Sequence, residues 1–335
     1  MHASYDDVML TASVARLEVV GLTVELPTEA GWIRPVNGVS FTLAEGETLG
    51  IVGESGSGKT MLSLALMGLE PPGARRSGEA WLDARGDGRM NLVADGREEL
   101  RSIRGRDIAM IFQEPMTALD PVMRIGAQVE EAIRVHEPWA SGGEIARRAI
   151  EALKRAAVPE PERRVRQYPH QLSGGLRQRV MIAWALAPGP RILIADEPTT
   201  ALDVTVQKQI LELLAQLRRE LQLSMLFITH DLGVVSQIAD RVMVMYAGRI
   251  VEEGPTAEVL RHPRHPYTEG LLRAAPRLER GKLTPIRGTV PALDALPPGC
   301  AFGPRCDLHI SDCDAAVPEL RSAAADHRAR CIFVS

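Results

Sequence analysis

Residues 48–60 are the stretch that most restricts how this chain can fold, because a short apolar strand leads straight into a glycine-rich loop. The loop fits the pattern G-x-x-x-x-G-K-[ST] at every fixed position and consists of Gly53, Glu54, Ser55, Gly56, Ser57, Gly58, Lys59 and Thr60. Its glycines can adopt backbone angles that a Cβ would forbid, so backbone N–H groups can approach a phosphate closely. A helix predicted over residues 61–69 would point its positive end at the same anion.

Two side chains of the loop add to this chemistry. Lys59 can reach β- and γ-phosphates as a point charge, and the Thr60 hydroxyl can bind Mg²⁺. The plain alternative is a glycine-rich turn with a chance lysine. Because strand, loop and helix come in the order that a phosphate site requires, we predict a nucleotide-binding site with Mg²⁺.

Composition excludes several other classes of function. A net charge of −4 and an aromatic content of 4% argue against bulk binding of nucleic acid and against base-stacking surfaces. No apolar run approaches the roughly 18 residues of a membrane span. The acidic start of the chain lacks the basic-then-apolar pattern of a signal peptide. We therefore expect a cytoplasmic protein with no nucleic-acid partner.

Strands and helices alternate along the chain, which predicts an α/β fold with a mainly parallel sheet. Apolar runs at 48–52, 108–112, 192–195 and 225–228 are typical of buried strands, and residues 204–221 form an amphipathic pattern typical of a helix. Strands are also expected at 16–25, 36–43, 78–83 and 90–93, and a hairpin over 241–246 and 249–253. Residues 1–15 show no clear period and read as a tail.

Four polar residues follow the predicted buried strands, where ligands of parallel sheets bind. Asp196 can hold Mg²⁺ indirectly, through the metal's own ligands, and Glu197 can orient or deprotonate an attacking water. Gln113 can contact both the metal and the water, and His230 can hydrogen-bond the γ-phosphate. Any one of them alone could be a polar strand end. Together, after a phosphate loop, they predict ATP hydrolysis with Glu197, His230 and Gln113 as catalytic residues.

These residues carry a family resemblance. Leu172-Ser-Gly-Gly175 resembles the signature of ATP-binding-cassette (ABC) ATPases, and residues 192–197 resemble their Walker B segment. Ala201-Leu202-Asp203 resembles the D-loop of that family, Gln113 its Q-loop and His230 its switch histidine. The resemblance implies a P-loop NTPase cassette over 16–256, with an antiparallel N-terminal β subdomain and a helical signature subdomain at about 115–178.

In this family two cassettes pair head to tail, so that the signature of one reaches the ATP of the other. The resemblance therefore implies that the partner's ATP is contacted by Ser173, Gly174, Gly175 and Asp203. The physics agrees with this assignment, since a helix that starts with two glycines is a site for anions.

The resemblance narrows to the ATPase subunits of bacterial dipeptide/oligopeptide (and nickel) importers. It rests on the phosphate loop, on Phe112-Gln-Glu-Pro-Met116, on Asp196-Glu-Pro-Thr-Thr-Ala-Leu-Asp-Val-Thr205 and on His265-Pro-Tyr-Thr268. It implies ATP-driven peptide import at the cytoplasmic face of the bacterial inner membrane, with residues 257–335 as the C-terminal domain of this importer type. Implied partners are a second, paralogous ABC ATPase subunit, two transmembrane permeases and an extracytoplasmic peptide-binding protein.

The chain departs from the family at two places. Leu176 stands where the signature often continues with Gln, which we interpret as tolerated. Leu26 stands where the family usually stacks an aromatic ring on adenine, so apolar contact remains without π-stacking, unless Trp32 takes the role.

All four cysteines, Cys300, Cys306, Cys313 and Cys331, lie in the last 36 residues with the spacing C-x₅-C-x₆-C-x₁₇-C. Clustered cysteines in a cytoplasmic chain suggest a metal site. Zinc sites favour tighter C-x₂₋₄-C pairs, whereas wide spacing suits a [4Fe–4S] cluster, and some importers of this type hold one there. We expect such a cluster to staple a proline-rich tail that is too poor in apolar residues to fold alone and that is separate from the core of the cassette, with zinc or unligated thiols as alternatives.

Other functions stay open at this point. Nickel or another solute could be the cargo. A soluble, non-transport ABC ATPase acting on ribosomes or in DNA repair is a further class, but such proteins usually fuse two cassettes or insert a long coiled coil, and this chain shows neither. A catalytically silent cassette is disfavoured by the intact Lys59, Asp196, Glu197 and His230.

Overall fold

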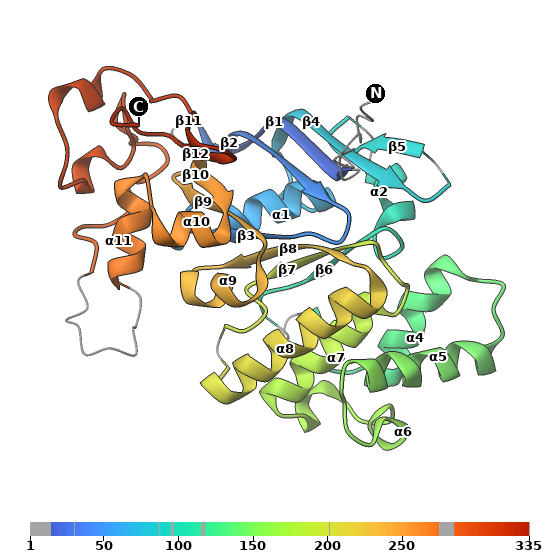
Figure 1. Ribbon diagram of the computed structural model, residues 1–335. Coiled ribbons are helices and arrows are strands. Elements are labelled where there is room, and N and C mark those ends of the chain that lie inside the picture. Colours follow the sequence, from blue (N-terminus) through green and yellow to red (C-terminus); the bar gives the residue numbers. More distant parts are fainter. Residues whose placement is uncertain are drawn as a thin grey trace, which may run out of the picture.

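The structure is a computed structural model that describes residues 15–29, 31–86, 88–94, 97–114, 118–200, 202–274 and 285–334. The predicted N-terminal tail, apart from its last residue, lies outside these residues. Two sheets form within them, with strand orders β2-β1-β4-β5 and β11-β12-β10-β9-β3-β8-β7-β6. Figure 1 shows helices α7 and α8 below the larger sheet and the smaller sheet above it.

The larger sheet confirms the prediction of an α/β fold. The five strands from β9 to the edge strand β6 run parallel, and their positions in the chain alternate with helices. The strands are β6 (Ile108–Ile111), β7 (Ile192–Asp196), β8 (Ser224–Thr229), β3 (Thr48–Val52) and β9 (Arg241–Tyr246). Every residue of β3, β6, β7 and β8 is buried, which explains why their sequences are apolar without alternation.

The smaller sheet is antiparallel and packs on the first helix of the phosphate site. Alternating buried residues such as Leu17, Val19 and Leu43 join α1 (Lys59–Met67) in one core. Its strands are β1 (Ala15–Thr28), β2 (Gly31–Ala44), β4 (Arg75–Ala84) and β5 (Gly88–Asn91). Both β1 and β2 are longer than the strands expected at 16–25 and 36–43, because β1 runs on to Thr28 and β2 starts at Gly31.

A helical region follows β6 and projects away from the C-terminal region in Figure 1. Ser141 caps one of its helices by accepting a hydrogen bond from the Glu144 backbone, and apolar residues of three helices share one core with the sheet. The helices are α4 (Ile125–His136), α5 (Gly142–Arg155), α6 (Pro161–Arg164) and α7 (Gly174–Leu186). Pro138 lies between α4 and α5, and Pro159 lies between α5 and α6.

Two helices of seven residues were not predicted, α2 (Arg97–Ile103) and α9 (Leu232–Ile238). Two turns of helix carry too few residues for a clear 3.6-residue period, and packing rather than propensity stabilises them. By contrast, the predicted helix at 204–221 matches α8 (Val204–Leu221) at both ends. The predicted hairpin is present as β9 and β10 (Arg249–Pro255).

The C-terminal region continues the cassette instead of standing apart from it. Strand β12 pairs antiparallel with β10, which adds β12 and β11 to the larger sheet. Tyr267 and Phe302 share a core with Val52, the last residue of β3. The expectation of a separate core for the tail is therefore wrong. The elements of this region are α10 (Thr256–Arg261), α11 (Pro266–Ala274), β11 (Arg321–Ala324) and β12 (His327–Ala329).

Within the described parts of the chain, no helix combines the length and the apolar character needed to cross a membrane.

Candidate active site

The phosphate loop lies between the end of β3 and the start of α1, and close packing requires two of its glycines, Gly53 and Gly58. A Cβ on Gly53 would lie 2.2 Å from the Met245 carbonyl oxygen. Gly58 has a φ of +104°, and a Cβ there would lie 1.9 Å from the Pro35 carbonyl oxygen. The loop is thus held from outside by strand β2 and by the end of β9.

Lys59 is buried at the first position of α1 with its ammonium group turned back onto the loop. It donates to the carbonyl oxygens of Gly53 at 2.7 Å and Glu54 at 3.0 Å, and to the Ser57 hydroxyl at 3.3 Å. Burial lowers the pKa of Lys59, and the carboxylates of Glu197, Asp196 and Glu54 offset part of this effect. The group is a buried cation with only neutral acceptors, which favours an anion at the loop.

Asp196 ends β7 beside the loop and is 1% exposed. Neither of its carboxylate oxygens has a hydrogen-bond partner of normal geometry. Burial raises the pKa of Asp196 to about 6, although the nearby Thr60 hydroxyl favours the charged form. Unpartnered buried carboxylate oxygens next to a hydroxyl fit a hard cation such as Mg²⁺, which prefers oxygen ligands.

Glu197 follows Asp196 with a φ of +46°, in the left-handed region, and its backbone N–H donates to the Ile228 carbonyl oxygen on β8 at 2.9 Å. The carboxylate accepts from the Thr200 hydroxyl at 2.7 Å and lies 3.2 Å from His230 Nδ1. The Glu197 side chain is 10% exposed and that of His230 57%. The structure therefore joins two predicted catalytic side chains in one hydrogen-bonded pair.

Gln113 lies two residues past β6 and is exposed. Because β6 is the parallel neighbour of β7, with Ile111 opposite Ala195, Gln113 emerges at the same edge as Asp196. Strands β6, β7, β8 and β3 thus bring the four predicted polar residues and the phosphate loop to one edge of the sheet.

The signature segment starts helix α7. Ser173 is its N-cap residue, and Gly174 and Gly175 are its first two residues. Ser173 and Gly174 are exposed, and the Ser173 side chain makes no capping hydrogen bond. Nearby, Asp203 caps α8 by accepting from the Val206 backbone at 2.9 Å.

Leu26 and Trp32, the two residues considered for adenine, lie on neighbouring strands. Leu26 is half-buried opposite Ile33 and packs on the core of the smaller sheet. Trp32 is 43% exposed, and the Arg75 guanidinium carbon lies 3.9 Å above the centre of its ring. A cation already covers one face of Trp32, so any base would have to stack on the other.

The four cysteines are free thiols that gather in the C-terminal region. The Cys300 backbone N–H donates to the Cys313 carbonyl oxygen at 2.8 Å. Burial raises the pKa of Cys300, Cys306 and Cys331, and the proximity of the other thiols adds to the effect. Yet among the described residues no three His, Cys, Asp or Glu side chains are arranged to hold a metal ion. The geometry as it stands therefore does not fit the expected iron–sulfur or zinc site.

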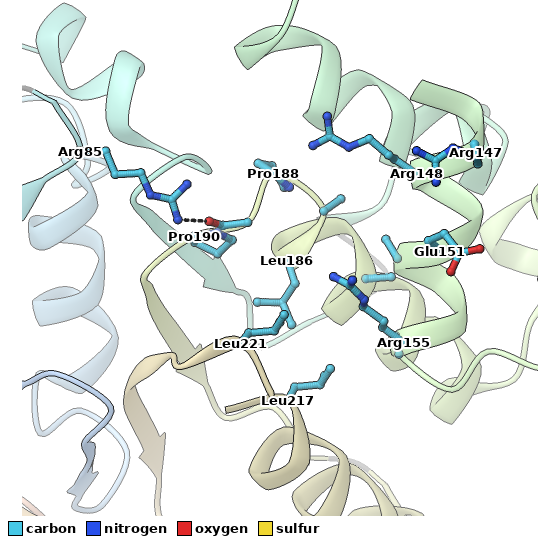
Figure 2. Close-up of a pocket in the computed structure, with 15 residues that line it drawn as sticks. Arg85, Arg147, Arg148, Glu151, Arg155, Leu186, Pro188, Pro190, Leu217 and Leu221 are labelled. Atoms are coloured by element: carbon cyan, nitrogen blue, oxygen red, sulfur yellow. Dashed lines mark hydrogen bonds between the residues drawn. The ribbon is translucent and has the colours of Figure 1, made fainter. Parts of the chain in front are cut away.

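A pocket of about 410 Å³ lies at the opposite end of the sheet, where β7 begins (Figure 2). Its floor is apolar, with Leu186, Leu217 and Leu221, and arginines line its rim. Arg148 is paired with Glu137, and Arg85 donates to the Gly189 carbonyl oxygen. This pocket is separate from the phosphate loop and takes no part in the candidate active site.

Sequence reasoning missed Thr200, which orients Glu197, and two C-terminal residues that contact the phosphate loop, Arg305 and Tyr267. Thr200 lies three residues after Glu197, so its hydroxyl could have been predicted from the sequence to lie near the catalytic carboxylate. Arg305 is 251 positions from Glu54, so no local sequence pattern could predict that contact.

Comparison with known proteins identifies the family of this chain. The profile of the family described as ABC transporter matches residues 36–200, and that described as oligopeptide/dipeptide transporter, C-terminal region, matches residues 251–313. Proteins of Brucella melitensis and Brucella abortus, each named as a candidate peptide import ATP-binding protein, are both 51% identical over 326 residues, covering 94% of this chain and 96% of their own.

Solved structures show the same fold. The dimeric bacterial ABC transporter cassette MJ0796 superposes with a TM-score of 0.63 and 32% identity, covering 72% of this chain and 98% of its own. A second structure of that cassette, in a post-hydrolysis state with ADP and phosphate, gives the same values. The chain therefore belongs to the ABC transporter family of ATP-binding proteins, in the branch that carries the oligopeptide/dipeptide transporter C-terminal region.

Proposed function

We propose that this chain is the ATP-hydrolysing subunit that powers import of di- or oligopeptides across the bacterial cytoplasmic membrane, attached at its cytoplasmic face. The observation that carries the proposal is the combination of an ABC cassette with the oligopeptide/dipeptide C-terminal region in one chain. Relatives that span almost all of this chain bear names of peptide import proteins, which supports peptides over nickel as cargo.

Phosphate binding is assigned to the loop at residues 53–60. Its backbone N–H groups and the start of α1 would hold the phosphates, and Lys59 would leave its carbonyl partners for the β- and γ-phosphates. Mg²⁺ would be held by Thr60, Gln113 and, directly or through water, by Asp196, and it would stabilise the negative charge that develops on the phosphate oxygens as ADP leaves. The unpartnered oxygens of Asp196 support this assignment.

Water activation is assigned to Glu197. Thr200 and His230 hold its Oε2 atom, which leaves Oε1 as the oxygen that can accept a proton from water. His230 is largely exposed, and its other ring nitrogen, Nε2, would face the γ-phosphate while Nδ1 stays with Glu197. Because two neighbours restrict the Glu197 carboxylate, we infer that Glu197 positions the attacking water and does not contact the phosphate.

A second cassette, which we propose to be a paralogue, would complete the γ-phosphate site. Ser173, Gly174, Gly175 and Asp203 would face the partner's ATP. Support comes from the exposed start of α7 and from Val204, an apolar residue next to Asp203 that is 81% exposed. An apolar side chain left in water beside such a segment favours a protein contact there.

Permease docking is assigned to a second pocket, of about 420 Å³, between α1, β6, α4 and α7. It is lined by apolar residues that include Leu69, Phe112, Val135 and Trp184, and Val135 is 67% exposed. Phe112 directly precedes Gln113, so a permease helix seated there would act on a residue of the ATP site. Two permeases would engage the two cassettes, and a peptide-binding protein would act through the permeases.

A [4Fe–4S] cluster at the four cysteines, with zinc as the alternative, is proposed on the family resemblance and on the gathering of the thiols. No step of the ATPase reaction is assigned to it, because the side chains are not arranged for a metal. Metal analysis of anaerobically purified protein decides the matter. About four irons per chain would support the cluster, stoichiometric zinc would replace it, and four alkylatable thiols without metal would reject both.

The function is tested by reconstituting the chain with its permeases, partner cassette and binding protein in lipid vesicles. We expect ATP-dependent uptake of labelled di- or oligopeptides, and co-purification with membrane permeases rather than with ribosomes. Val135→Glu tests the proposed docking pocket, and it should abolish co-purification with the permeases while ATP binding persists. Uptake of nickel but not of peptides would redirect the cargo assignment, and association with ribosomes would reject transport.

A further inference from the structure

Glu54, the first variable residue of the phosphate loop, is held by residues of the C-terminal region, which follows the β9–β10 hairpin. Arg305 binds its carboxylate with both terminal nitrogens, Nη1 to Oε2 at 2.6 Å and Nη2 to Oε1 at 3.0 Å. The Glu54 backbone N–H donates to the Tyr267 hydroxyl at 2.8 Å. Two residues of the C-terminal region thus fix both the side chain and the main chain of one loop residue.

Arg305 is itself rigidly placed. Its side chain is 4% exposed, and it also donates to the carbonyl oxygen of Arg287 at 2.9 Å and to the Tyr246 hydroxyl at 3.3 Å. A guanidinium whose nitrogens are already directed by several acceptors offers a preformed fork for a carboxylate. The ion pair therefore holds Glu54 at a fixed place.

An aromatic cluster supports the same contact from below. Tyr246 and Tyr267 lie with ring centres 4.6 Å apart, and Phe302 lies 5.4 Å from Tyr246 and 5.3 Å from Tyr267. Val52, the residue before the loop, belongs to the same core. Tyr267 is fully buried, so its hydroxyl cannot swing away from Glu54 without disturbing this cluster.

Glu54 has a third contact, with Lys59, and a bound nucleotide would break it. Lys59 donates to the Glu54 carbonyl oxygen at 3.0 Å, and a phosphate at the loop would draw its ammonium group away. Glu54 would then be held by Arg305 and Tyr267 alone. The loop can thus exchange a lysine contact for a phosphate contact without collapsing, because its outer end is fixed from the C-terminal region.

We propose that Arg305 and Tyr267 are positioning residues that keep the phosphate loop in the shape that receives ATP. The C-terminal region is then part of the nucleotide site, in addition to any role in assembly. The proposal rests on ATP occupying this loop, as argued above. A bare structural anchor would instead stabilise the C-terminal region without any effect on nucleotide affinity.

The test compares single variants of the full chain by ATP affinity, by kcat and KM in the assembled transporter, and by melting temperature. Tyr267→Phe removes one hydroxyl from Glu54 and keeps the ring, and Arg305→Met keeps the stem without the fork. Each should weaken ATP binding about fivefold to twentyfold, as the loss of one or two hydrogen bonds to the loop predicts, with KM rising more than kcat falls. Arg305→Lys should restore only part of the affinity, since an ammonium cannot bind a carboxylate with two nitrogens.

Two further comparisons separate the outcomes. Glu54→Gln combined with Arg305→Met should bind ATP no worse than Arg305→Met alone, because both changes break one contact. Arg321→Ala, an exposed arginine of β11, should match wild type. Lys59→Ala must lose ATP binding in the same assay, and normal binding by that variant would reject the phosphate site itself. If Lys59→Ala fails to bind while Tyr267→Phe and Arg305→Met bind like wild type with lowered melting temperatures, only the positioning role is rejected.

Discussion

The phosphate loop at residues 53–60 and the signature segment at 173–175 are both glycine-rich and both begin a helix, yet their surroundings differ. Around the loop, backbone from β2 and β9 leaves no room for a Cβ on Gly53 or Gly58. At Gly174, a Cβ would meet only a Leu202 methyl group, at 3.8 Å. At Gly175 a Cβ would lie 2.8 Å from a Val206 methyl group, so the signature segment is open to solvent at Ser173 and Gly174 and packed only at its third residue.

This difference shows which half of the chemistry a single chain can provide. The loop, Asp196 and the Glu197–His230 pair converge on one edge of the sheet, where we propose that a nucleotide binds to residues of this chain alone. The signature segment leaves the N–H groups at the start of α7 without a side-chain capping hydrogen bond, and we propose that they bind an anion supplied from elsewhere. A second cassette supplies it in the arrangement that we propose.

The largest effect is expected at Gly58. Gly58→Ala would force a Cβ to 1.9 Å from the Pro35 carbonyl oxygen at a φ of +104°. We expect a loss of about 4 kcal/mol or more of unfolding free energy. Gly142→Ala, with nothing within 4 Å of its Cβ, is the control and should stay within about 0.5 kcal/mol. Chemical denaturation measures both, and equal stabilities would show that the loop is not tightly packed.

Asp196→Asn should raise the stability of the nucleotide-free protein at pH 8. Burial raises the pKa of Asp196 from 3.8 to about 6. The charged form is thus disfavoured on folding, and stability falls as pH rises between these values and stays low above pH 6. Removing the charge should restore up to about 3 kcal/mol at pH 8 and less at pH 5, while Mg²⁺-dependent ATP binding is lost. A melting difference independent of pH would contradict this account.

Leu26→Tyr tests how the nucleotide site holds the adenine ring. A ring at this position should tighten ATP binding by about 1–2 kcal/mol, the scale of one base–aromatic stack. If Trp32 already stacks on adenine with its free face, Leu26→Tyr should do little and Trp32→Ala should weaken binding. Affinities of the two variants distinguish these cases, and no change in either would place adenine elsewhere.

Gly174→Ala should have the smallest effect on stability and still impair function. Its Cβ makes an ordinary contact, so unfolding free energy should change by less than about 0.5 kcal/mol. In the assembled pair, however, the methyl group would face the partner's γ-phosphate, and turnover should fall. Normal turnover by this variant would remove the signature from the composite site.

Features with a local sequence pattern could be predicted from the sequence, and contacts between distant residues could not. The bounds of β3 and α8 and the strand-end positions of Asp196 and His230 were predictable, because buried strands and amphipathic helices leave local patterns. The pairing of β12 with β10 and the Arg305–Glu54 contact join residues 75 to 251 positions apart, where no local pattern exists. The gathering of the thiols followed the expectation from clustered cysteines, but a metal-binding arrangement did not.

The central claim is that this site hydrolyses ATP with Glu197 acting on water, and one variant tests it most directly. In the assembled transporter, Glu197→Gln keeps the shape of the side chain and its contacts with Thr200 and His230 but cannot accept the proton. We predict ATP binding close to wild type, turnover lowered about a hundredfold or more, and cassettes trapped as a closed pair. Hydrolysis by Glu197→Gln at the wild-type rate would contradict the account.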